Sequence, residues 1–466
     1  MLTFQDLQAV GEDKNKRMEF VRSAISQHKS SDMYKTAKIA DEYYKGLNTT
    51  ITHYEKTLTN LSGQVVPDRW SPNHKVKSKF LKRFTTQQNQ FLLGNGVTWQ
   101  NEGTADRLGE DFDTQLQDLG LDALLGAVAF GFLNLDTSTD AGRVYKLEVF
   151  EITEFVPLLD EENGSLRSGV RFWQIDDSKP LRATLYEEDG YTDYIWENKD
   201  GKENGSILTE KKTYIINTKS SEIDGTEILD GENYPSFPIV PLWGNPEHQS
   251  ELVGIRDGID AYDLIKNGFL NDLDSAQIYW IIKGAGGMND PDLVQFLERL
   301  KFTKAAAPAD GQEVEAKTID VPHEARDTLL DRIEHDLYRD YMAFDSDRVA
   351  NGAATATEIR AAYEAMNSKA DLYEYQILKF LKKIMKLAEI KDKPTFTRSY
   401  IINTQEEVQT VVSAGTYLTE DYATRKILTL LGDGDKADEI LQQQDADEIE
   451  RITDVVTEEE TEEVTE

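Results

Sequence analysis

The sequence predicts an α+β protein in which helices predominate. Segments with apolar residues at helical spacing occupy the beginning of the chain and most of the part after residue 250. Between residues 143 and 243, short segments rich in β-branched and aromatic residues alternate with turn sequences. With 39% hydrophobic residues among 466, the chain can bury a sizeable core. Its length predicts about two to four structural units.

Charge and composition exclude several classes of protein. The chain holds 86 Asp and Glu against 51 Lys and Arg, and its formal charge of −35 argues against a surface that binds nucleic-acid phosphates everywhere. It has no Cys, which excludes disulfides, Cys-ligated metals and thiol nucleophiles. No apolar export signal is visible, and the longest apolar run, Ala123–Leu135, is too short to span a bilayer. We interpret that run as a buried helix, and we expect a soluble protein made in the cytoplasm, with no membrane partner.

The first half of the chain is predicted to pass from helices to strands. Residues 1–62 are predicted to be helical, up to the break at Pro67. A basic amphipathic helix is predicted over 73–93, ended by the turn sequence GNG. Segments such as YKLEVF, LRATLY and YTDYIW predict antiparallel hairpins between residues 143 and 243. Three prolines in residues 234–241 end this β-rich region.

The second half is predicted to contain three long helices. Helices over 251–275 and 324–344 enclose a small α/β insert, residues 276–323. A loop over 345–356 leads into a helix over 357–388, whose apolar residues recur at alternating steps of four and three. The remaining chain is predicted to hold a strand over 395–402, short helices over 406–413 and 419–431, and an acidic tail over 433–466 that is expected to be disordered in its last stretch.

No sequence motif points to an enzyme. The chain has no phosphate-binding P-loop, no G-x-S-x-G motif and no H-E-x-x-H motif, and its six His are isolated from one another. Asp345-x-Asp347 begins like a calcium-binding loop, but Val349 stands where the next oxygen ligand belongs. We therefore expect no catalytic residue, no metal site and no cofactor. The abundant carboxylates leave one alternative open, a metal-dependent hydrolase built on clustered Asp and Glu.

Two features allow both a structural and a functional interpretation. The cations between Lys75 and Arg83 are more typical of a solvated helix face that pairs with local carboxylates than of a binding site. The helix over 357–388 is interpreted equally well as an ordinary buried helix or as a contact between subunits.

The two helices around the insert are acidic. Residues 251–275 hold six acidic and two basic residues, and residues 324–348 hold eight and four, so each segment has a net charge of −4. The candidate acidic-face residues are Asp257, Asp260, Asp331 and Asp340. Such a face is either a solvated outer surface or the lining of a passage for another polyanion. An acidic lining would repel the phosphates of a DNA duplex and let it slide without sticking.

The order of these elements is similar to that of a known family. The clearest segment is YPSFPIVPLWGNPEHQSELVGIRDGIDAYDLIKNGFLNDLDSAQIYWIIKGAG, and weaker matches are NQFLLGNGVTW, DALLGAVAFGF and EVFEITEFVPLLDEENGSLRSGVRFW. Over roughly residues 30–430 the chain resembles the portal proteins of tailed bacteriophages, of the SPP1 type found in phages of Gram-positive hosts. The similarity lies in element order and carries no catalytic signature.

The resemblance implies a portal fold that assembles as a ring, usually of twelve subunits. It implies N-terminal helices and a β-rich wing over 1–250, a first stem helix over 251–275, an α/β clip over 276–323, a second stem helix over 324–344, a tunnel loop over 345–356, a long helix and returning wing strand over 357–403, a helical crown over 404–432 and the acidic tail over 433–466. The tunnel loop would place Asp345, Asp347, Arg348 and Asn351 near DNA.

The function that the resemblance implies is mechanical. The ring would sit at one vertex of the capsid in the virion, after assembly in the host bacterial cytoplasm, and would conduct double-stranded DNA during packaging and ejection without sequence specificity. Its expected partners are further copies of the chain, DNA, the terminase large subunit, the major capsid and scaffolding proteins, and a head-completion adaptor. The alternatives are the carboxylate-based hydrolase and another component of the head–tail connector.

Overall fold

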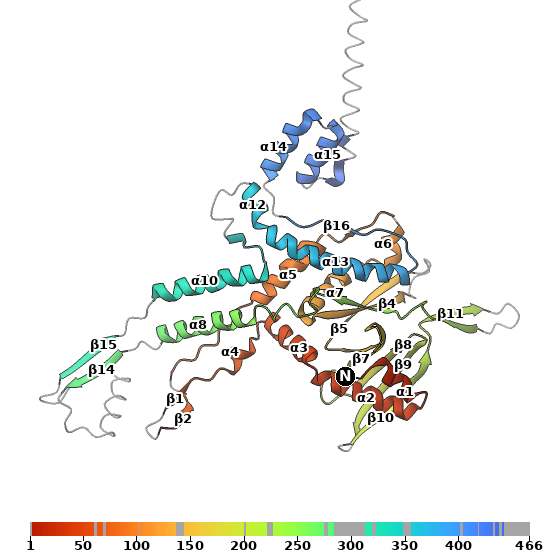
Figure 1. Cartoon of the computed structure of the whole chain (residues 1–466), viewed down its shortest axis with the longest axis horizontal. Coiled ribbons are helices and arrows are strands. Elements are labelled where there is room, and N and C mark those ends of the chain that lie inside the picture. Colours follow the sequence, from red (N-terminus) through yellow and green to blue (C-terminus); the bar gives the residue numbers. More distant parts are fainter. Residues whose placement is uncertain are drawn as a thin grey trace, which may run out of the picture. The chain divides into compact units, whose positions relative to one another are not determined.

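The computed structural model describes residues 2–59, 63–68, 71–101, 103–136, 144–199, 202–220, 227–274, 278–283, 313–318, 323–347, 356–400, 404–417, 419–431, 434–437 and 440–441. These residues form more helix than strand, so the predicted α+β class is confirmed (Figure 1). The chain divides into two compact units. The first unit is Met1–Ala343 with Leu372–Thr397, and the second is Phe344–Asp371 with Arg398–Glu466.

Four capped helices begin the first unit. They are α1 (Phe4–Val10), α2 (Lys14–Ser30), α3 (Asp32–Tyr44) and α4 (Thr49–His53). Each follows a residue whose side-chain oxygen accepts backbone N–H groups of the first turn: Thr3, Asp13, Ser31 and Asn48. The helical region ends earlier than the predicted residue 62, because β1 (Thr57–Thr59) pairs with β2 (Val65–Pro67). Their β-branched residues favour strand.

Helix α5 (Phe80–Leu93) begins seven residues later than the helix predicted over 73–93. Residues 73–79 are extended instead, and they run beside α8 (Arg256–Asp274). The prediction of a helix there is wrong because the N–H groups of this segment find partners on another helix, which periodicity within the segment cannot reveal.

Side chains of α8 hold the extended segment by its backbone. Three N–H groups spaced two residues apart donate to three acceptors spaced four residues apart on the helix. The pairs are His74 N to Asn271 Oδ1 (2.7 Å), Val76 N to Asn267 Oδ1 (2.7 Å) and Ser78 N to Asp263 Oδ1 (2.9 Å). Four helical residues rise about 6 Å and two extended residues span about 6.6 Å, so the two repeats match. We refer to this arrangement as the backbone ladder.

The largest core surrounds a three-stranded antiparallel sheet of order β13–β4–β5. The strands are β4 (Val128–Asp136), β5 (Val144–Glu151) and β13 (Ile239–Trp243). The prediction of one buried helix over Ala123–Leu135 is therefore wrong. Helix α7 (Phe112–Gly126) ends first, Ala127 adopts a φ of +72°, and β4 follows. The run is buried as expected, but its second half pairs with strands on both sides.

Helix α13 (Glu364–Leu387) covers this core with its residues from Leu372 onward. The Phe380 ring lies so close to Gly131 that a Cβ added there would be 2.6 Å from the ring. Tyr373 donates through its hydroxyl to Asn89 Oδ1 at 2.8 Å. The heptad positions Tyr373, Ile377, Phe380, Ile384 and Leu387 are all buried in this core. For this part of the helix, the interpretation as an ordinary buried helix is confirmed.

A five-stranded antiparallel sheet of order β10–β9–β8–β7–β6 forms the second core of the first unit. Its strands are β6 (Phe155–Leu159), β7 (Leu166–Trp173), β8 (Leu181–Glu187), β9 (Gly190–Lys199) and β10 (Lys202–Lys212). Apolar residues of α1 and α2, such as Leu7 and Ile25, share a core with Val170 and Leu185 of this sheet. A separate hairpin joins β11 (Ile215–Ser220) to β12 (Glu227–Glu232). The predicted antiparallel hairpins are thus present.

Two short elements complete the first unit. Strand β16 (Thr395–Phe396) pairs with β3 (Val97–Thr98), and α6 (Gly103–Leu108) follows β3. The strand predicted over 395–402 is therefore present over its first two residues. Residues 401–402 lie outside the described part of the chain.

The second unit contains a small aromatic cluster and two helix pairs. Phe344 stacks on Tyr363 with ring centroids 4.0 Å apart, and Tyr400 meets the Tyr363 ring edge-on. Tyr363 separates α12 (Ala356–Ala362) from α13, so the helix predicted over 357–388 is interrupted by a turn. Helices α14 (Thr404–Ala414) and α15 (Glu420–Leu431) pack together, accompanied by the 3-10 turns η1 (Gly415–Tyr417) and η2 (Gly434–Lys436). The predicted disorder of the tail concerns residues that lie outside the described part of the chain.

Replacing Glu389 with glycine should raise the free energy of unfolding by about 1 kcal/mol. Glu389 follows the end of α13 with a φ of +53°, and Ile390 donates its N–H to the Met385 carbonyl at 2.9 Å. Glycine is preferred at this helix-end position because it has no Cβ. Urea denaturation measures the change. Glu389→Ala removes the same charge but keeps Cβ, so an equal gain in that control would contradict the backbone explanation.

Candidate functional site

Two antiparallel helices, α8 and α10 (His323–Tyr341), form the central feature of the candidate site (Figure 1). At one end, a Cβ added to Gly258 would lie 2.8 Å from Leu337, so the missing side chain lets the helices approach closely. At the other end, Asp272 and Arg326 form a salt bridge of 2.6 Å. Phe269 and His323 meet edge-on beside it, with ring centroids 5.5 Å apart.

The helix pair is anchored in a core of its own. Ile255, Ile259 and Leu337 are buried with Phe84 of α5. Phe84 also stacks on Tyr341, with ring centroids 4.9 Å apart, and Tyr341 donates to Gln88 Oε1 at 2.7 Å. The root of the pair is therefore fixed to the first unit by apolar and polar contacts together.

A two-stranded hairpin follows the pair in the chain between α8 and α10. Strand β14 (Ile278–Lys283) pairs antiparallel with β15 (Glu313–Thr318). Both predicted strands of the insert are present, and the helix predicted after Pro291 lies outside the described residues.

The acidic residues of α8 mostly face the protein. Asp260 accepts hydrogen bonds from the hydroxyls of Tyr43 (2.6 Å) and Thr50 (2.8 Å), and Asp263 accepts one from Asn48 Nδ2 (2.9 Å). Asp272 pairs with Arg326. Asp257 remains exposed. Asp260 therefore does not belong to an exposed acidic face, a distinction that counting charges along the segment could not make.

The acidic residues of α10 are exposed but do not form a single stripe. Asp331 and Asp340 are both exposed. Nine residues at about 100° each place them on opposite sides of the helix. Glu324 and Asp327 lie on the side of Asp331. The structure thus separates the candidate acidic-face residues into two groups.

The predicted loop is described only at its beginning. Asp347 donates its N–H to Asp345 Oδ1 at 3.2 Å, a turn that follows Phe344 in the second unit. Arg348 and Asn351 lie outside the described residues. The structure therefore gives no geometry for the DNA-proximal role of this loop.

The basic residues between Lys75 and Arg83 have local partners. Lys75 donates to the Thr52 carbonyl at 2.7 Å, and the Lys82 ammonium lies 5.4 Å from the centre of the Tyr44 ring. Arg83 donates to the Tyr338 hydroxyl at 2.6 Å and lies 3.9 Å from Glu334. These contacts support the interpretation of a solvated face with local pairing.

One functional-site candidate, Asp122 on α7, escaped the sequence analysis. Burial, followed by the nearby carboxylates of Glu151, Asp118 and Asp41, raises the pKa of Asp122 to about 8. With carboxylates so abundant in the chain, no spacing distinguishes this group from chance. Among the residues that the structure describes, no three His, Asp or Glu are grouped so that they could hold a metal ion.

The histidines have separate surroundings. His28 is buried, with its Nε2 2.7 Å from the Ile152 carbonyl, and burial lowers its pKa. His248 stacks on Trp243, with ring centroids 3.8 Å apart. His74 lies 3.2 Å from Asp274 at the end of α8. Within the described ranges, no helix is both long and apolar enough to cross a membrane.

The helix pair, its hairpin and the adjoining β-rich body are the build of a structural protein of the phage portal class. A family model described as "Phage portal protein, SPP1 Gp6-like" matches residues 24–450. The chain therefore belongs to the SPP1 Gp6-like family of phage portal proteins, and the resemblance inferred from the sequence is confirmed.

Two curated relatives agree with this assignment. The portal protein of Clostridium phage phiCD119 is 26% identical over 329 residues, which cover 66% of this chain and 69% of the relative. The portal protein of Bacillus phage SPP1 is 22% identical over 418 residues, which cover 85% and 80%. Among solved structures, a chain from the neck of an empty gene transfer agent particle matches with a TM-score of 0.39 and 12% identity, covering 76% of this chain and 90% of that one. No functional conclusion follows from so distant a likeness.

Proposed function

We propose that copies of this portal protein assemble into a ring at one capsid vertex and conduct double-stranded DNA during packaging and ejection. The family match over residues 24–450 carries this proposal. The ring would dock the terminase large subunit during packaging and a head-completion adaptor afterwards. Major capsid and scaffolding proteins would surround it in the assembling head.

The helix pair fits the role of the stem in such a ring. It is fixed at its root by the core around Phe84 and leads, along the chain, to the β14–β15 hairpin, which we assign to the clip. We assign the body before residue 250 to the wing, α14 and α15 to the crown, and residues 345–356 to the tunnel loop. Asp345, Asp347, Arg348 and Asn351 stay predictions for DNA proximity.

The exposed carboxylates of the stem would reduce adhesion of DNA. Asp257, Asp331 and Asp340 are available for this role, whereas Asp260 is occupied by Tyr43 and Thr50. A stem with free carboxylates offers phosphates no strong binding point, so a duplex can move past it. Such a surface suits transport rather than retention.

Negative-stain images of the purified chain test the ring directly. We expect rings with a central opening wide enough for a duplex. Each copy carries −35, so screening of repulsion should increase the ring fraction in sedimentation as salt rises from about 0.05 to 0.5 M. Compact monomers at every salt concentration, together with Mg²⁺- or Mn²⁺-dependent nuclease activity that EDTA abolishes, would favour the hydrolase instead.

A further inference from the structure

The exposed face of α13 carries a stripe of lysines. Lys379, Lys382, Lys383 and Lys386 are exposed on the side of the helix opposite its buried heptad positions. Lys391 and Lys393 extend the basic region beyond the helix end. Residues 379–393 hold six Lys against Glu389 and Asp392, a net charge of +4 in a chain of −35. We call these six residues the lysine stripe.

The stripe is left without carboxylate partners inside the described part of the chain. No Asp or Glu described by the structure lies within 4.0 Å of the ammonium groups of Lys382, Lys383, Lys386, Lys391 or Lys393. Asp392 is occupied instead by backbone N–H groups of Gln100 and Asn101, at 3.1 Å each, and by the Thr104 hydroxyl at 2.7 Å. In a chain with 86 acidic residues, unpaired cations at this density indicate a partner outside the described residues.

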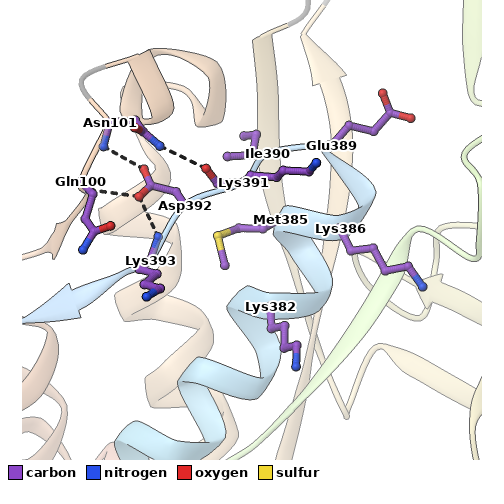
Figure 2. Close-up of a pocket in the computed structure, with 10 residues that line it drawn as sticks. All are labelled: Gln100, Asn101, Lys382, Met385, Lys386, Glu389, Ile390, Lys391, Asp392 and Lys393. Atoms are coloured by element: carbon purple, nitrogen blue, oxygen red, sulfur yellow. Dashed lines mark hydrogen bonds between the residues drawn. The ribbon is translucent and has the colours of Figure 1, made fainter.

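A pocket of about 730 Å³ lies at the end of the stripe (Figure 2). Met385 and Ile390, both almost fully buried, supply its apolar floor. Lys382, Lys386 and Lys393 supply cations at its rim. The pocket therefore combines an apolar floor with a cationic rim.

This combination fits an acidic peptide that also carries branched aliphatic side chains. Nucleic acid fits less well, because the pocket lining offers no aromatic ring on which a base could stack. The chain's own tail has the matching composition. Residues 445–456, DADEIERITDVV, place five acidic residues among Ile449, Ile452, Val455 and Val456. The chain between Lys393 and Asp445 is long enough, at about 3.3 Å per residue, for length to impose no restriction.

We propose that the acidic tail, residues 445–456, docks in the pocket at the end of the lysine stripe, with its aliphatic side chains on Met385 and Ile390 and its carboxylates against Lys382, Lys386 and Lys393. Docking would pair the most acidic segment with the most basic one and would hold the tail on the first unit. This inference does not depend on ring formation or on DNA transport.

Carbodiimide cross-linking of the full chain, followed by mass spectrometry, tests the proposal. This reagent joins a lysine to a carboxylate only where the two are already in contact. We expect tail carboxylates to be linked to Lys382, Lys386 and Lys393 at least about fivefold more often than to Lys35 and Lys38, which are exposed lysines of α3 without such a pocket. Equal linkage to both sets would overturn the proposal.

Two tail variants separate docking from general charge attraction. Ile449→Ser with Ile452→Ser keeps every charge, and it should lower cross-linking at the pocket at least about threefold, because the apolar floor loses its occupant. Val464→Ser, outside the docking segment, is the matched control and should change nothing. Unchanged cross-linking in the double variant would contradict the proposal. So would binding of a DNA duplex to the full chain that Lys382→Gln with Lys386→Gln abolishes.

Discussion

Replacing Asn267 with leucine should lower the free energy of unfolding by about 3 kcal/mol. Asn267 is the central rung of the backbone ladder. Its Oδ1 accepts from Val76 N and its Nδ2 donates to the Val76 carbonyl, both at 2.7 Å. Leucine has a similar volume but can make neither bond, so both backbone groups of Val76 lose their partner. The effect should be larger than that of an ordinary surface substitution because Asn267 is buried.

Urea denaturation and amide hydrogen exchange measure this effect together. Exchange should accelerate first at residues 74, 76 and 78, since the whole segment depends on the same helix face. Val76→Thr is the matched control, because the Val76 side chain is 41% exposed and takes no part in the ladder. Loss of stability in Asn267→Leu without faster exchange at residue 76 would show that the ladder is not the cause.

Replacing Asp122 with asparagine should stabilise the protein increasingly as the pH rises. The pKa of Asp122 is raised from its ordinary value of 3.8 to about 8, mainly by burial. Between these two values the folded chain holds a proton that the unfolded chain has released, so wild-type stability falls as pH rises through this window. Asparagine has no proton to lose and removes this dependence.

The stability difference between Asp122→Asn and the wild type should widen by about 2 kcal/mol between pH 5 and pH 8. Denaturation at both pH values measures it. Asp118→Asn is the control, because Asp118 is exposed and lies one turn earlier on the same helix. A pH-independent difference for Asp122→Asn would mean that Asp122 is ionised in the folded chain at pH 8.

Periodicity predicted those elements whose residues bury one face against their own neighbours. The heptad positions from Tyr373 to Leu387 are buried in the observed core, and the hairpins of the β-rich region are present. Two segments were assigned wrongly for a shared reason. The run Ala123–Leu135 and residues 73–79 both take partners that are distant in sequence, a strand in one case and a helix face in the other. Local pattern contains no information about such partners.

The candidate site shows the same limit. Net charge identified α8 and α10 as acidic, but only the fold shows that Asp260 accepts hydrogen bonds from Tyr43 and Thr50. The same holds for Asp331 and Asp340, which are separated by the turn of the helix. Asp122 was missed because its altered pKa depends on burial and on Glu151, which follows it by 29 positions.

The contact between Gly131 and Phe380 has a consequence for synthesis of the protein. Strand β4 leaves the ribosome long before the helix that covers it, and the 249 intervening positions must be translated before Phe380 exists. Until then the sheet around Gly131 presents apolar surface to solvent. A nascent chain of this protein is therefore a natural client for the host's chaperones, and release from them should coincide with completion of α13.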